Sequence, residues 1–292
     1  MKEHFAIKMN LSLIQELAGS YSSKVELYRD ENTQKLWVLK TVPSGDTEEI
    51  ANEKYFLSQL KLNGLNTIEF QDSPFGQPNQ ILLEYLQDSI TVGESKSEAA
   101  FELFGQQMAA MHNITFDSCF SLDSSGQKQP ISWEQFILNN LDYGLERIKL
   151  KEISMTDQEI DLIIRRITSL SQKIIDTTFS LLHCDSHSNN ALFVSRTQQV
   201  YLFDKGSSIV AGSPFYDLAV ILIEFPHLFG IGDASGENQS LYKAFVKGYV
   251  TDFWADYPDL CRDYVLLRSI GRVGSPFNPY LVDLIRKIIA YD

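Results

Sequence analysis

The sequence contains little cysteine and no excess of basic residues, and each shortage excludes a class of protein. Its cysteines are odd in number and widely spaced, which fits neither a disulfide framework nor a CxxC metal site: Cys119, Cys184 and Cys261. Lysine and arginine number 25 against 38 acidic residues, a formal charge of -13. Nucleic acids and anionic lipids bind clustered basic residues, so we expect no nucleic-acid partner. An acidic surface suits a cationic substrate, but it also serves solubility alone.

Long apolar runs are missing as well. The most apolar stretch, residues 218–229, is interrupted by Glu224 and Pro226, well short of the roughly 20 apolar residues that span a bilayer. The opening ten residues, MKEHFAIKMN, lack the apolar region of a secretory signal. We therefore expect a cytoplasmic protein with no membrane partner.

The composition is that of a globular chain. Of 292 residues, 44% are hydrophobic and 12% aromatic, which is enough for a packed core. We find no fixed-period repeat and no low-complexity segment, so solenoid, fibrous and disordered proteins are excluded. The length fits one large domain or two modest ones.

The first third of the chain has β-strand patterns and one helix pattern. Residues 25–29 and 35–42 are β-prone runs joined by a polar turn, which predicts an antiparallel hairpin with Lys40 on its second strand. Asp46 and Glu49 resemble a helix cap, and a helix containing Glu53 is expected after them. Two more strands are expected: residues 67–70 and 80–86. The polar residues 87–89 that follow are the candidate hinge.

Helical patterns dominate the remainder. Apolar residues repeat at helical spacing up to about His112. Helix starts are expected where a cap residue precedes a Gln or Glu by three positions, at Ser132 and at Thr156. One hairpin, residues 191–194 and 200–203, is embedded among these helices. The order is therefore a β-rich small lobe, a hinge and a helical large lobe.

The embedded hairpin is flanked by the most polar segments of the chain. His183, Asp185, His187 and Asn190 lie close together before its first strand, and Asp204 follows its second strand. A carboxylate next to apolar strands is costly unless it is paired or bound to a cation. Two aspartates and an asparagine are hard oxygen ligands, which suggests magnesium with a nucleotide phosphate.

This pattern resembles a known family. The motif His183-x-Asp185-x-His187-x-x-Asn190, then Asp204-x-Gly206 and later Asp217, is similar to the aminoglycoside phosphotransferase and choline kinase group. The resemblance covers nearly the whole chain. It implies an α+β, two-lobed protein-kinase-like fold, with a small antiparallel sheet lobe and a larger, mainly helical lobe. The expected units are a nucleotide-binding lobe, residues 1–86, and a lobe with the catalytic loop and acceptor site, residues 87–292.

The resemblance also implies roles for individual residues. Asp185 would be the catalytic base that accepts the proton of the attacking hydroxyl. Asn190 and Asp204 would hold Mg²⁺ against the phosphates of ATP. Lys40 would contact those phosphates, and Glu53 would pair with Lys40. Asp217 and the histidines are expected to support the loop.

Further nucleotide contacts are expected by position. Residues 19–23 stand where a phosphate-covering loop belongs; they contain one glycine, and the hydroxyls of Ser20 and Ser22 are candidate phosphate contacts. A plain turn explains this segment about equally well. Adenine is expected at the hinge, against backbone groups near Glu84 and Leu86.

Three alternatives to a small-molecule kinase are considered. A transition-metal hydrolase built on the paired histidines is disfavoured, because the chain has only five histidines. A pseudokinase or nucleotide-binding regulator is the stronger rival, because Lys205 stands inside the Asp-x-Gly motif and Cys184 replaces the usual glycine before Asp185. A protein-serine kinase is disfavoured, because Asp204 and Asp217 are too close for a long activation loop.

The expected function is therefore ATP-dependent transfer of the γ-phosphate to a hydroxyl of a small molecule, such as an aminoglycoside, a choline-like amine or another metabolite. The acceptor is expected against a helical insert at about residues 130–180 and the later helices. Acidic residues there would suit a cationic acceptor or merely form a solvated face: Asp142, Glu146, Asp233 and Glu237.

Overall fold

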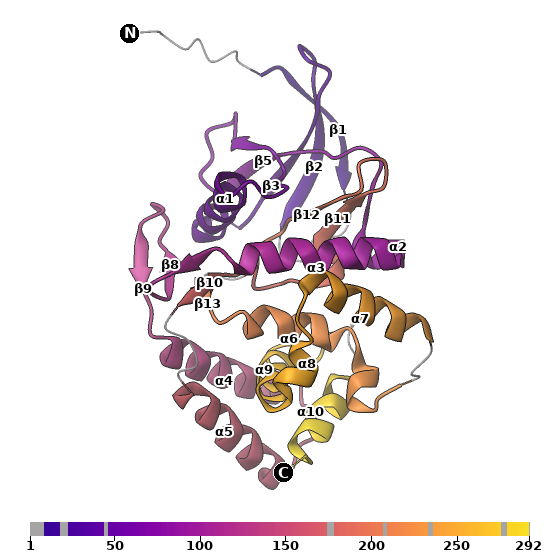
Figure 1. Ribbon diagram of the computed structural model, residues 1–292. Coiled ribbons are helices and arrows are strands. Elements are labelled where there is room, and N and C mark those ends of the chain that lie inside the picture. The colour runs from indigo at the N-terminus through magenta and orange to yellow at the C-terminus, as the bar shows by residue number, and fades with distance from the viewer. Residues whose placement is uncertain are drawn as a thin grey trace.

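The computed structural model describes residues 9–17, 23–43, 46–173, 178–206, 209–232, 236–275 and 279–291. Two lobes lie one above the other, and the N-terminal third of the chain forms the smaller one (Figure 1). The larger lobe is mainly helical and continues to the C-terminus. The predicted α+β, two-lobed protein-kinase-like fold is therefore confirmed.

The small lobe is an antiparallel sheet with one long helix. The five strands stand in the order β1-β2-β3-β5-β4. Their bounds are β1 Leu11–Leu17, β2 Lys24–Asp30, β3 Leu36–Thr41, β4 Phe70–Asp72 and β5 Gln80–Glu84, and the helix is α1 Thr47–Leu62. The predicted hairpin is present, with Tyr28 of β2 opposite Trp37 of β3. Trp37 and Leu39 pack on one face of the sheet, so Lys40 points from the other face, towards α1.

Two expectations for this lobe were wrong. Asp46 precedes α1 but makes no capping hydrogen bond with its side chain, and Glu49 reaches Lys40 instead. The strand expected at residues 67–70 begins only at Phe70. Thr67 directs its hydroxyl to the carbonyl of Leu57 in α1, and this contact competes with a sheet ladder.

The large lobe contains the remaining helices and two small sheets. Its α-helices are α2 Val92–Ser95, α3 Glu98–His112, α4 Trp133–Leu150, α5 Asp157–Gln172, α6 Phe215–Ile223, α7 Gly236–Tyr249, α8 Phe253–Asp256, α9 Pro258–Ile270 and α10 Leu281–Ile289. Short 3₁₀ helices are η1 Ser188–Asn190 and η2 Pro226–Phe229. The predicted caps are present: Thr156 forms a full capping box with Glu159, and the Ser132 hydroxyl accepts from the Gln135 amide. Among the described residues, no helix is both long and apolar enough to cross a membrane.

One sheet of the large lobe contains more strands than expected. It has the order β7-β10-β13-β8-β9, with the bounds β7 Thr115–Phe116, β8 Phe120–Leu122, β9 Lys128–Pro130, β10 Phe179–Leu181 and β13 Ile209–Gly212. The structure buries all four residues of β13, so β13 lacks the polar alternation by which an exposed strand is recognised. Strands β10 and β13 flank the polar segments in sequence and fix where those segments begin and end.

The hinge leads directly into the other sheet. Strand β6, Ser89–Thr91, pairs with β11, Ala191–Val194, which pairs with β12, Gln199–Leu202. The predicted hairpin is thus confirmed, and the residues just after the hinge form its third strand. Figure 1 shows this sheet between the small lobe and α3. The hairpin therefore lies at the boundary of the two lobes.

Candidate functional site

Lys40 connects the two lobes through its ammonium group. Its Nζ atom lies 2.8 Å from Glu53 Oε2, 2.7 Å from Asp204 Oδ1 and 3.1 Å from Glu49 Oε1. Glu49 and Glu53 are on α1 and Asp204 follows β12, so this side chain joins β3 to α1 and to the segment after β12. The expected pairing of Lys40 with Glu53 is thus present.

Burial and charge act in opposite directions on this group. Burial would lower the pKa of Lys40, but the carboxylates of Glu53 and Asp204 outweigh it and raise the pKa above its ordinary value. Burial also raises the pKa of Glu53, against the lowering effect of Lys40. Lys40 is therefore a fixed positive charge at neutral pH.

Asp217, in the first turn of α6, holds the polar loop that follows β10. Its carboxylate accepts the backbone N–H groups of His183 and Cys184, each at 2.7 Å. Its own carbonyl accepts the Ser186 hydroxyl at 2.8 Å, and His112 Nε2 lies 3.3 Å from the carboxylate. Asp217 has no exposed surface. A buried carboxylate with several donors is a rigid anchor for a loop.

His183 attaches the same loop to the end of β12. Its Nε2 lies 2.8 Å from the Phe203 carbonyl, and its ring packs edge-on against Phe56 of α1 at 5.3 Å between centroids. Burial lowers the pKa of His183. A neutral, enclosed imidazole with these contacts supports structure and is not positioned for proton transfer.

Two backbone features explain why the motif favours glycine. Cys184 has a φ of 68°, a left-handed conformation that costs a side-chain-bearing residue about 1 kcal/mol. The fold holds it there through Asp217 and through Arg268, which donates to the Cys184 carbonyl. At Gly206, an added Cβ would lie 2.6 Å from the Cβ of Asp185. A side chain at Gly206 would therefore displace Asp185.

Asp185 is held on both carboxylate oxygens. Oδ2 lies 3.1 Å from Asn190 Nδ2 and 3.4 Å from His187 Nε2, and Oδ1 is ion-paired with Arg272. Burial would raise the pKa of Asp185, but the hydrogen bond from His187 and the charge of Arg272 outweigh it and hold the pKa well below its usual value. Asp185 is therefore ionised at neutral pH.

The hairpin brings Asn190 and Asp204 together. Asn190 directly precedes β11 and Asp204 follows β12, and the Phe203 N–H donates to the Asn190 carbonyl at 3.2 Å. Asn190 uses its amide nitrogen on Asp185, which leaves its amide oxygen for another partner. Asp204 is 44% exposed. These two oxygen donors suit Mg²⁺, which usually takes one or two protein ligands together with water and phosphate oxygens. Among the residues with described positions, no group of three His, Cys, Asp or Glu side chains could hold a metal.

Lys205, which follows Asp204, points away from it. Its Nζ donates to the Ile209 carbonyl at 2.7 Å and to the Gly206 carbonyl at 3.0 Å, and only 2% of the residue is exposed. Burial lowers the pKa of Lys205. Asp204 is therefore paired with Lys40 and not with its neighbour in sequence.

Adenine is expected near Glu84 and Leu86. These residues lie at the end of β5 and directly before the hinge residues 87–89. Glu84 ends β5, its carboxylate lies 3.0 Å from Lys35 Nζ, and its N–H donates to the Glu69 carbonyl at 2.8 Å. The Leu86 carbonyl accepts the Ser89 hydroxyl at 2.7 Å, and the Leu86 N–H donates to none of the described residues. Ser20 and Ser22 lie outside the described residues.

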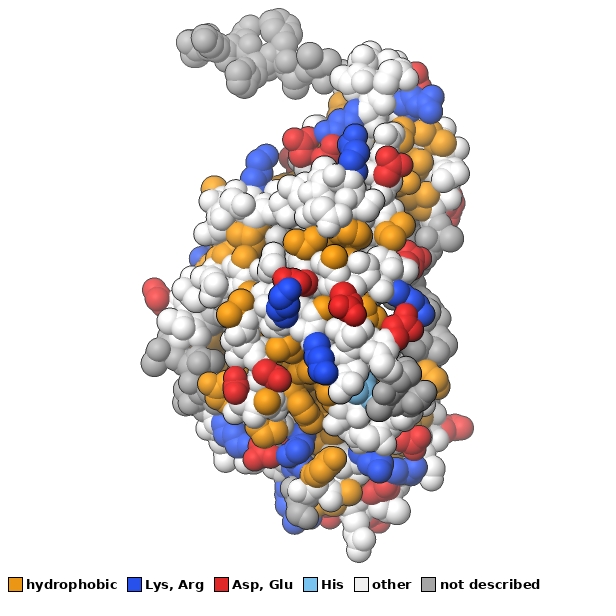
Figure 2. Space-filling model, turned by 45° about the vertical axis from the view of Figure 1, so that its right-hand side comes forward, with side chains coloured by type: hydrophobic (Ala, Val, Ile, Leu, Met, Phe, Trp, Pro, Cys, Tyr) orange, Lys and Arg blue, Asp and Glu red, His pale blue; other side chains and the backbone are white. Residues whose placement is uncertain are grey.

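The acidic residues expected near an acceptor are dispersed. Asp142, Glu146 and Glu237 are exposed, and Glu237 lies 4.0 Å from Lys96. Asp233 lies outside the described residues. Figure 2 shows acidic and basic side chains interspersed over one face of the molecule.

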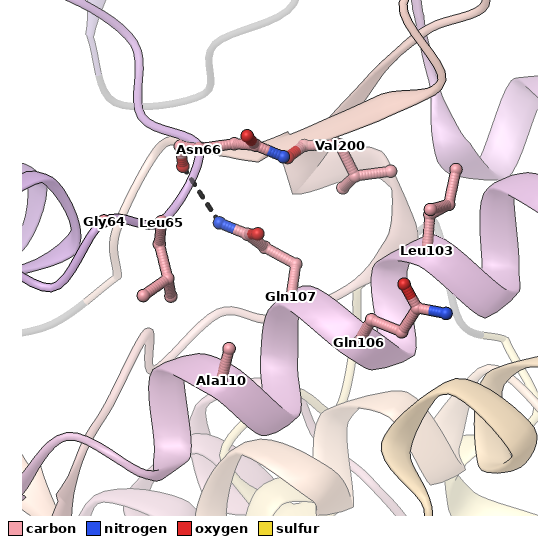
Figure 3. Close-up of a pocket in the computed structure, with 8 residues that line it drawn as sticks. All are labelled: Gly64, Leu65, Asn66, Leu103, Gln106, Gln107, Ala110 and Val200. Atoms are coloured by element: carbon pink, nitrogen blue, oxygen red, sulfur yellow. Dashed lines mark hydrogen bonds between the residues drawn. The ribbon is translucent and has the colours of Figure 1, made fainter.

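A cavity of about 340 Å³ lies elsewhere, between the segment after α1, helix α3 and strand β12 (Figure 3). It is lined by Gly64, Leu65, Asn66, Leu103, Gln106, Gln107, Ala110 and Val200. Gln107 donates to the Asn66 carbonyl at 2.9 Å, and Asn66 donates to the Val200 carbonyl at 3.2 Å. None of the expected site residues lines this cavity. It therefore lies where the two lobes meet, apart from the candidate site.

Sequence reasoning missed two arginines, one in the last turn of α9 and one in the turn that follows it. Arg268 donates to the Cys184 carbonyl and the Tyr216 hydroxyl, and Arg272 contacts Asp185. Their spacing of four residues, directly after the apolar run 265–267, was an available signal, because buried arginines occur where they have partners. The partner could not be known before the fold was.

The sequence and the fold of this chain are similar to those of known proteins. The model of a family described as the phosphotransferase enzyme family matches residues 14–258. A search of curated proteins found no match. Among solved structures, a protein described as a fructosamine-3-kinase from Haemophilus somnus is 18% identical, with a TM-score of 0.65 over 96% of this chain and 92% of that one.

Two further structures are similar. A choline kinase from Streptococcus pneumoniae is 18% identical, with a TM-score of 0.55 over 96% of this chain and 93% of that one. An aminoglycoside phosphotransferase from Streptomyces rimosus, solved with ADP and streptomycin, is 15% identical, with a TM-score of 0.55 over 84% and 90%. Identities this low show a common fold and do not transfer a substrate.

Proposed function

The chain belongs to the phosphotransferase enzyme family, and we propose that it transfers the γ-phosphate of ATP to a hydroxyl group of a small molecule. One observation carries the proposal: the ammonium of Lys40 contacts both Glu53 and Asp204, while Asn190 connects the Asp204 hairpin to Asp185. These contacts connect a cation, two candidate metal-ligand oxygens and a carboxylate across the lobe boundary. Phosphoryl transfer needs these groups, because its catalysis rests on positioning and charge.

Asn190 and Asp204 would hold Mg²⁺, and Lys40 would contact the phosphates. When bound, the metal neutralises charge on the phosphate oxygens. Lys40 is already oriented by Glu53, so it can shift from the Asp204 carboxylate to a phosphate oxygen without leaving α1. The adenine would lie at the hinge, against backbone groups near Glu84 and Leu86, where the Leu86 N–H donates to none of the described residues. Ser20 and Ser22 would contact the phosphates.

Asp185 would accept the proton of the acceptor hydroxyl. The acceptor oxygen forms a bond to the γ-phosphorus, the bond from phosphorus to the ADP oxygen breaks, and the hydroxyl proton passes to Asp185. Asn190 and His187 orient its carboxylate.

The structure weakens the case for a regulator without turnover. One motive for that alternative was Lys205, but its ammonium is bonded to the Ile209 and Gly206 carbonyls, so it does not compete for Asp204. Cys184 adopts the conformation that the motif glycine would take. An active enzyme therefore remains the proposal, with residues 1–86 as its nucleotide lobe and 87–292 as its catalytic lobe.

The test separates nucleotide binding from transfer. ATP with Mg²⁺ should raise the melting temperature of the protein, because a ligand of the native state stabilises it. EDTA or Asp204→Ala should remove most of that rise, whereas Asp185→Ala should keep it. ATP consumption over a panel of hydroxylated metabolites and antibiotics should be abolished in Asp185→Ala. Undiminished turnover in that variant would refute the role of Asp185.

A further inference from the structure

The carboxylate of Asp185 is accompanied by an arginine from a distant part of the chain. Arg272 lies in the turn just after α9, its Nη2 is ion-paired with Asp185 Oδ1, and its side chain is 21% exposed. Its Nη1 atom is buried and has no hydrogen-bond partner among the residues whose positions are described. A buried donor without a partner costs about 1–3 kcal/mol. Such a group is expected to find an acceptor when a ligand binds.

Arg268, one helical turn earlier, is engaged differently. It donates to the Cys184 carbonyl and the Tyr216 hydroxyl, and its guanidinium stacks on the Tyr216 ring at 4.1 Å. These contacts fix Arg268 in place. Burial lowers the pKa of Arg272, and the nearby charge of Arg268 lowers it further. A negative charge beside Arg272 would relieve this repulsion.

Among the described residues, Asp185 is the one carboxylate that forms an ion pair with Arg272, and Glu224 acts on it only at longer range. Glu224 is the next acidic group near His187, but its two oxygens accept from the Ser188 amide at 2.9 Å and hydroxyl at 2.8 Å. Burial raises the pKa of Glu224, so its negative charge is disfavoured. Two arginines and His187 therefore surround the single charge of Asp185.

Asp185 cannot serve fully as a base while it is paired in this way. Arg272 neutralises the carboxylate and competes with an incoming hydroxyl for Oδ1. Asn190 and His187 hold the other oxygen and come from the loop itself, so Arg272 is the partner that can leave. An anionic group on the acceptor would draw the guanidinium away, because arginine binds carboxylates and phosphates through two parallel hydrogen bonds.

We propose that Arg272 is the anion-binding residue of the acceptor site, and that the acceptor carries a carboxylate or a phosphate next to the hydroxyl that is phosphorylated. This inference rests on the proposed kinase function and narrows its substrate class. It departs from the cationic acceptor that the acidic composition suggested. When the acceptor anion binds Arg272, the guanidinium leaves Asp185. The same step makes the Asp185 carboxylate accessible to the acceptor hydroxyl.

The test compares matched alcohols that differ in charge. D-glycerate and glycerol 3-phosphate carry the two anionic groups, glycerol is the neutral match, and choline is the cationic match. Melting temperatures are measured with each probe in the presence of MgADP, and ATP consumption is measured with MgATP. We expect the anionic probes to stabilise the protein and glycerol and choline to have no effect. The anion that gives the larger rise in melting temperature identifies the anionic group of the acceptor.

Variants of Arg272 link the effect to this residue. Arg272→Gln should lower affinity for the anionic probe by about tenfold or more, the effect of one charged hydrogen bond, and Arg272→Lys should retain part of it. Arg165→Gln, a change at an exposed arginine that donates to the Asp161 carbonyl of its own helix, should have no effect. The MgATP-dependent rise in melting temperature should be the same in all four proteins, which excludes misfolding as the cause.

The outcomes separate this inference from the proposed function. If MgATP stabilises the protein but neither anionic probe does, or if Arg272→Gln binds the anion as well as the wild type, the inference is wrong and the kinase proposal stands. Turnover of choline that Arg272→Gln leaves intact would overturn it as well. If MgATP itself gives no stabilisation, the proposed function fails first.

Discussion

Lys40 Nζ lies 2.7 Å from Oδ1 of Asp204, although 164 residues separate them in the chain. This contact joins the β3 strand of the small lobe to the hairpin of the large lobe. The second partner of the ammonium, Glu53, is almost fully buried. The contact therefore belongs both to the fold and to the proposed site, and the two contributions can be separated by mutation.

Lys40→Met should lower both stability and activity. Removing one member of a buried ion pair leaves Glu53 uncompensated, at a cost of about 3–5 kcal/mol, measurable by urea denaturation. The double variant Lys40→Met/Glu53→Leu should recover most of that stability but none of the MgATP binding. Lys54→Met, which breaks the more exposed pair with Asp72, should cost less than about 1 kcal/mol. Equal losses in the two single variants would contradict this account.

Lys205→Met should behave differently from Lys40→Met, although both lysines adjoin Asp204. The Lys205 ammonium bonds to two backbone carbonyls and does not contact the proposed metal ligand. We expect the affinity for MgATP, measured by calorimetry, to change less than about threefold, because no interaction with the ligand is lost. A loss of MgATP affinity comparable to that of Lys40→Met would show that Lys205 contributes to phosphate binding. That result would support the regulator hypothesis.

Asp217→Asn should weaken the whole catalytic loop. An amide offers one oxygen where the carboxylate now accepts from His183 and Cys184, so one buried N–H loses its partner. The expected cost is about 2–3 kcal/mol, read from thermal or urea unfolding. Asp259→Asn, a change in a largely exposed pair with Arg262, is the matched control. Equal stability of the two variants would show that Asp217 does not anchor the loop.

His187 should make stability depend on pH. Burial would lower its pKa, but the hydrogen bond with Asp185 and the charge of Asp185 outweigh it and raise the pKa above 6.5. The folded state thus binds more protons than the unfolded state above pH 6.5, so this contribution is complete below pH 6.5 and is lost as pH rises through the folded pKa. NMR titration of the His187 ring in Asp185→Asn should return its pKa towards 6.5; an unchanged value would refute the coupling.

The sequence revealed the family and the lobe order because the informative residues are dense and near strand ends. His183, Asp185 and Asn190 occupy one segment, and the polar turn before Asn190 and the hairpin after it can be read from composition. The family match over residues 14–258 confirms this resemblance. Residues that are close in the sequence were sufficient for this prediction, because the loop and the hairpin are short.

Sequence patterns did not predict the features that depend on long-range contacts, and the reason is physical. Strands β10 and β13 are short and, in β13, buried on both faces, so they show no period of two. Glu49 was read as a cap, but its side chain is better satisfied by the ammonium of Lys40. Arg272 resembles any arginine near a helix end until the fold brings Asp185 to it. Tertiary contacts decided each of these positions.

The pairing of β6 with β11 has a mechanical consequence. Thr91 lies opposite Leu192 and Ser89 opposite Val194, so the linker between the lobes and the hairpin behind Asn190 form one continuous sheet. Any rotation of the small lobe that strains the linker acts on that hairpin directly, before it reaches the helices below. We therefore expect the positions of Asn190 and Asp204 to change with the angle between the lobes.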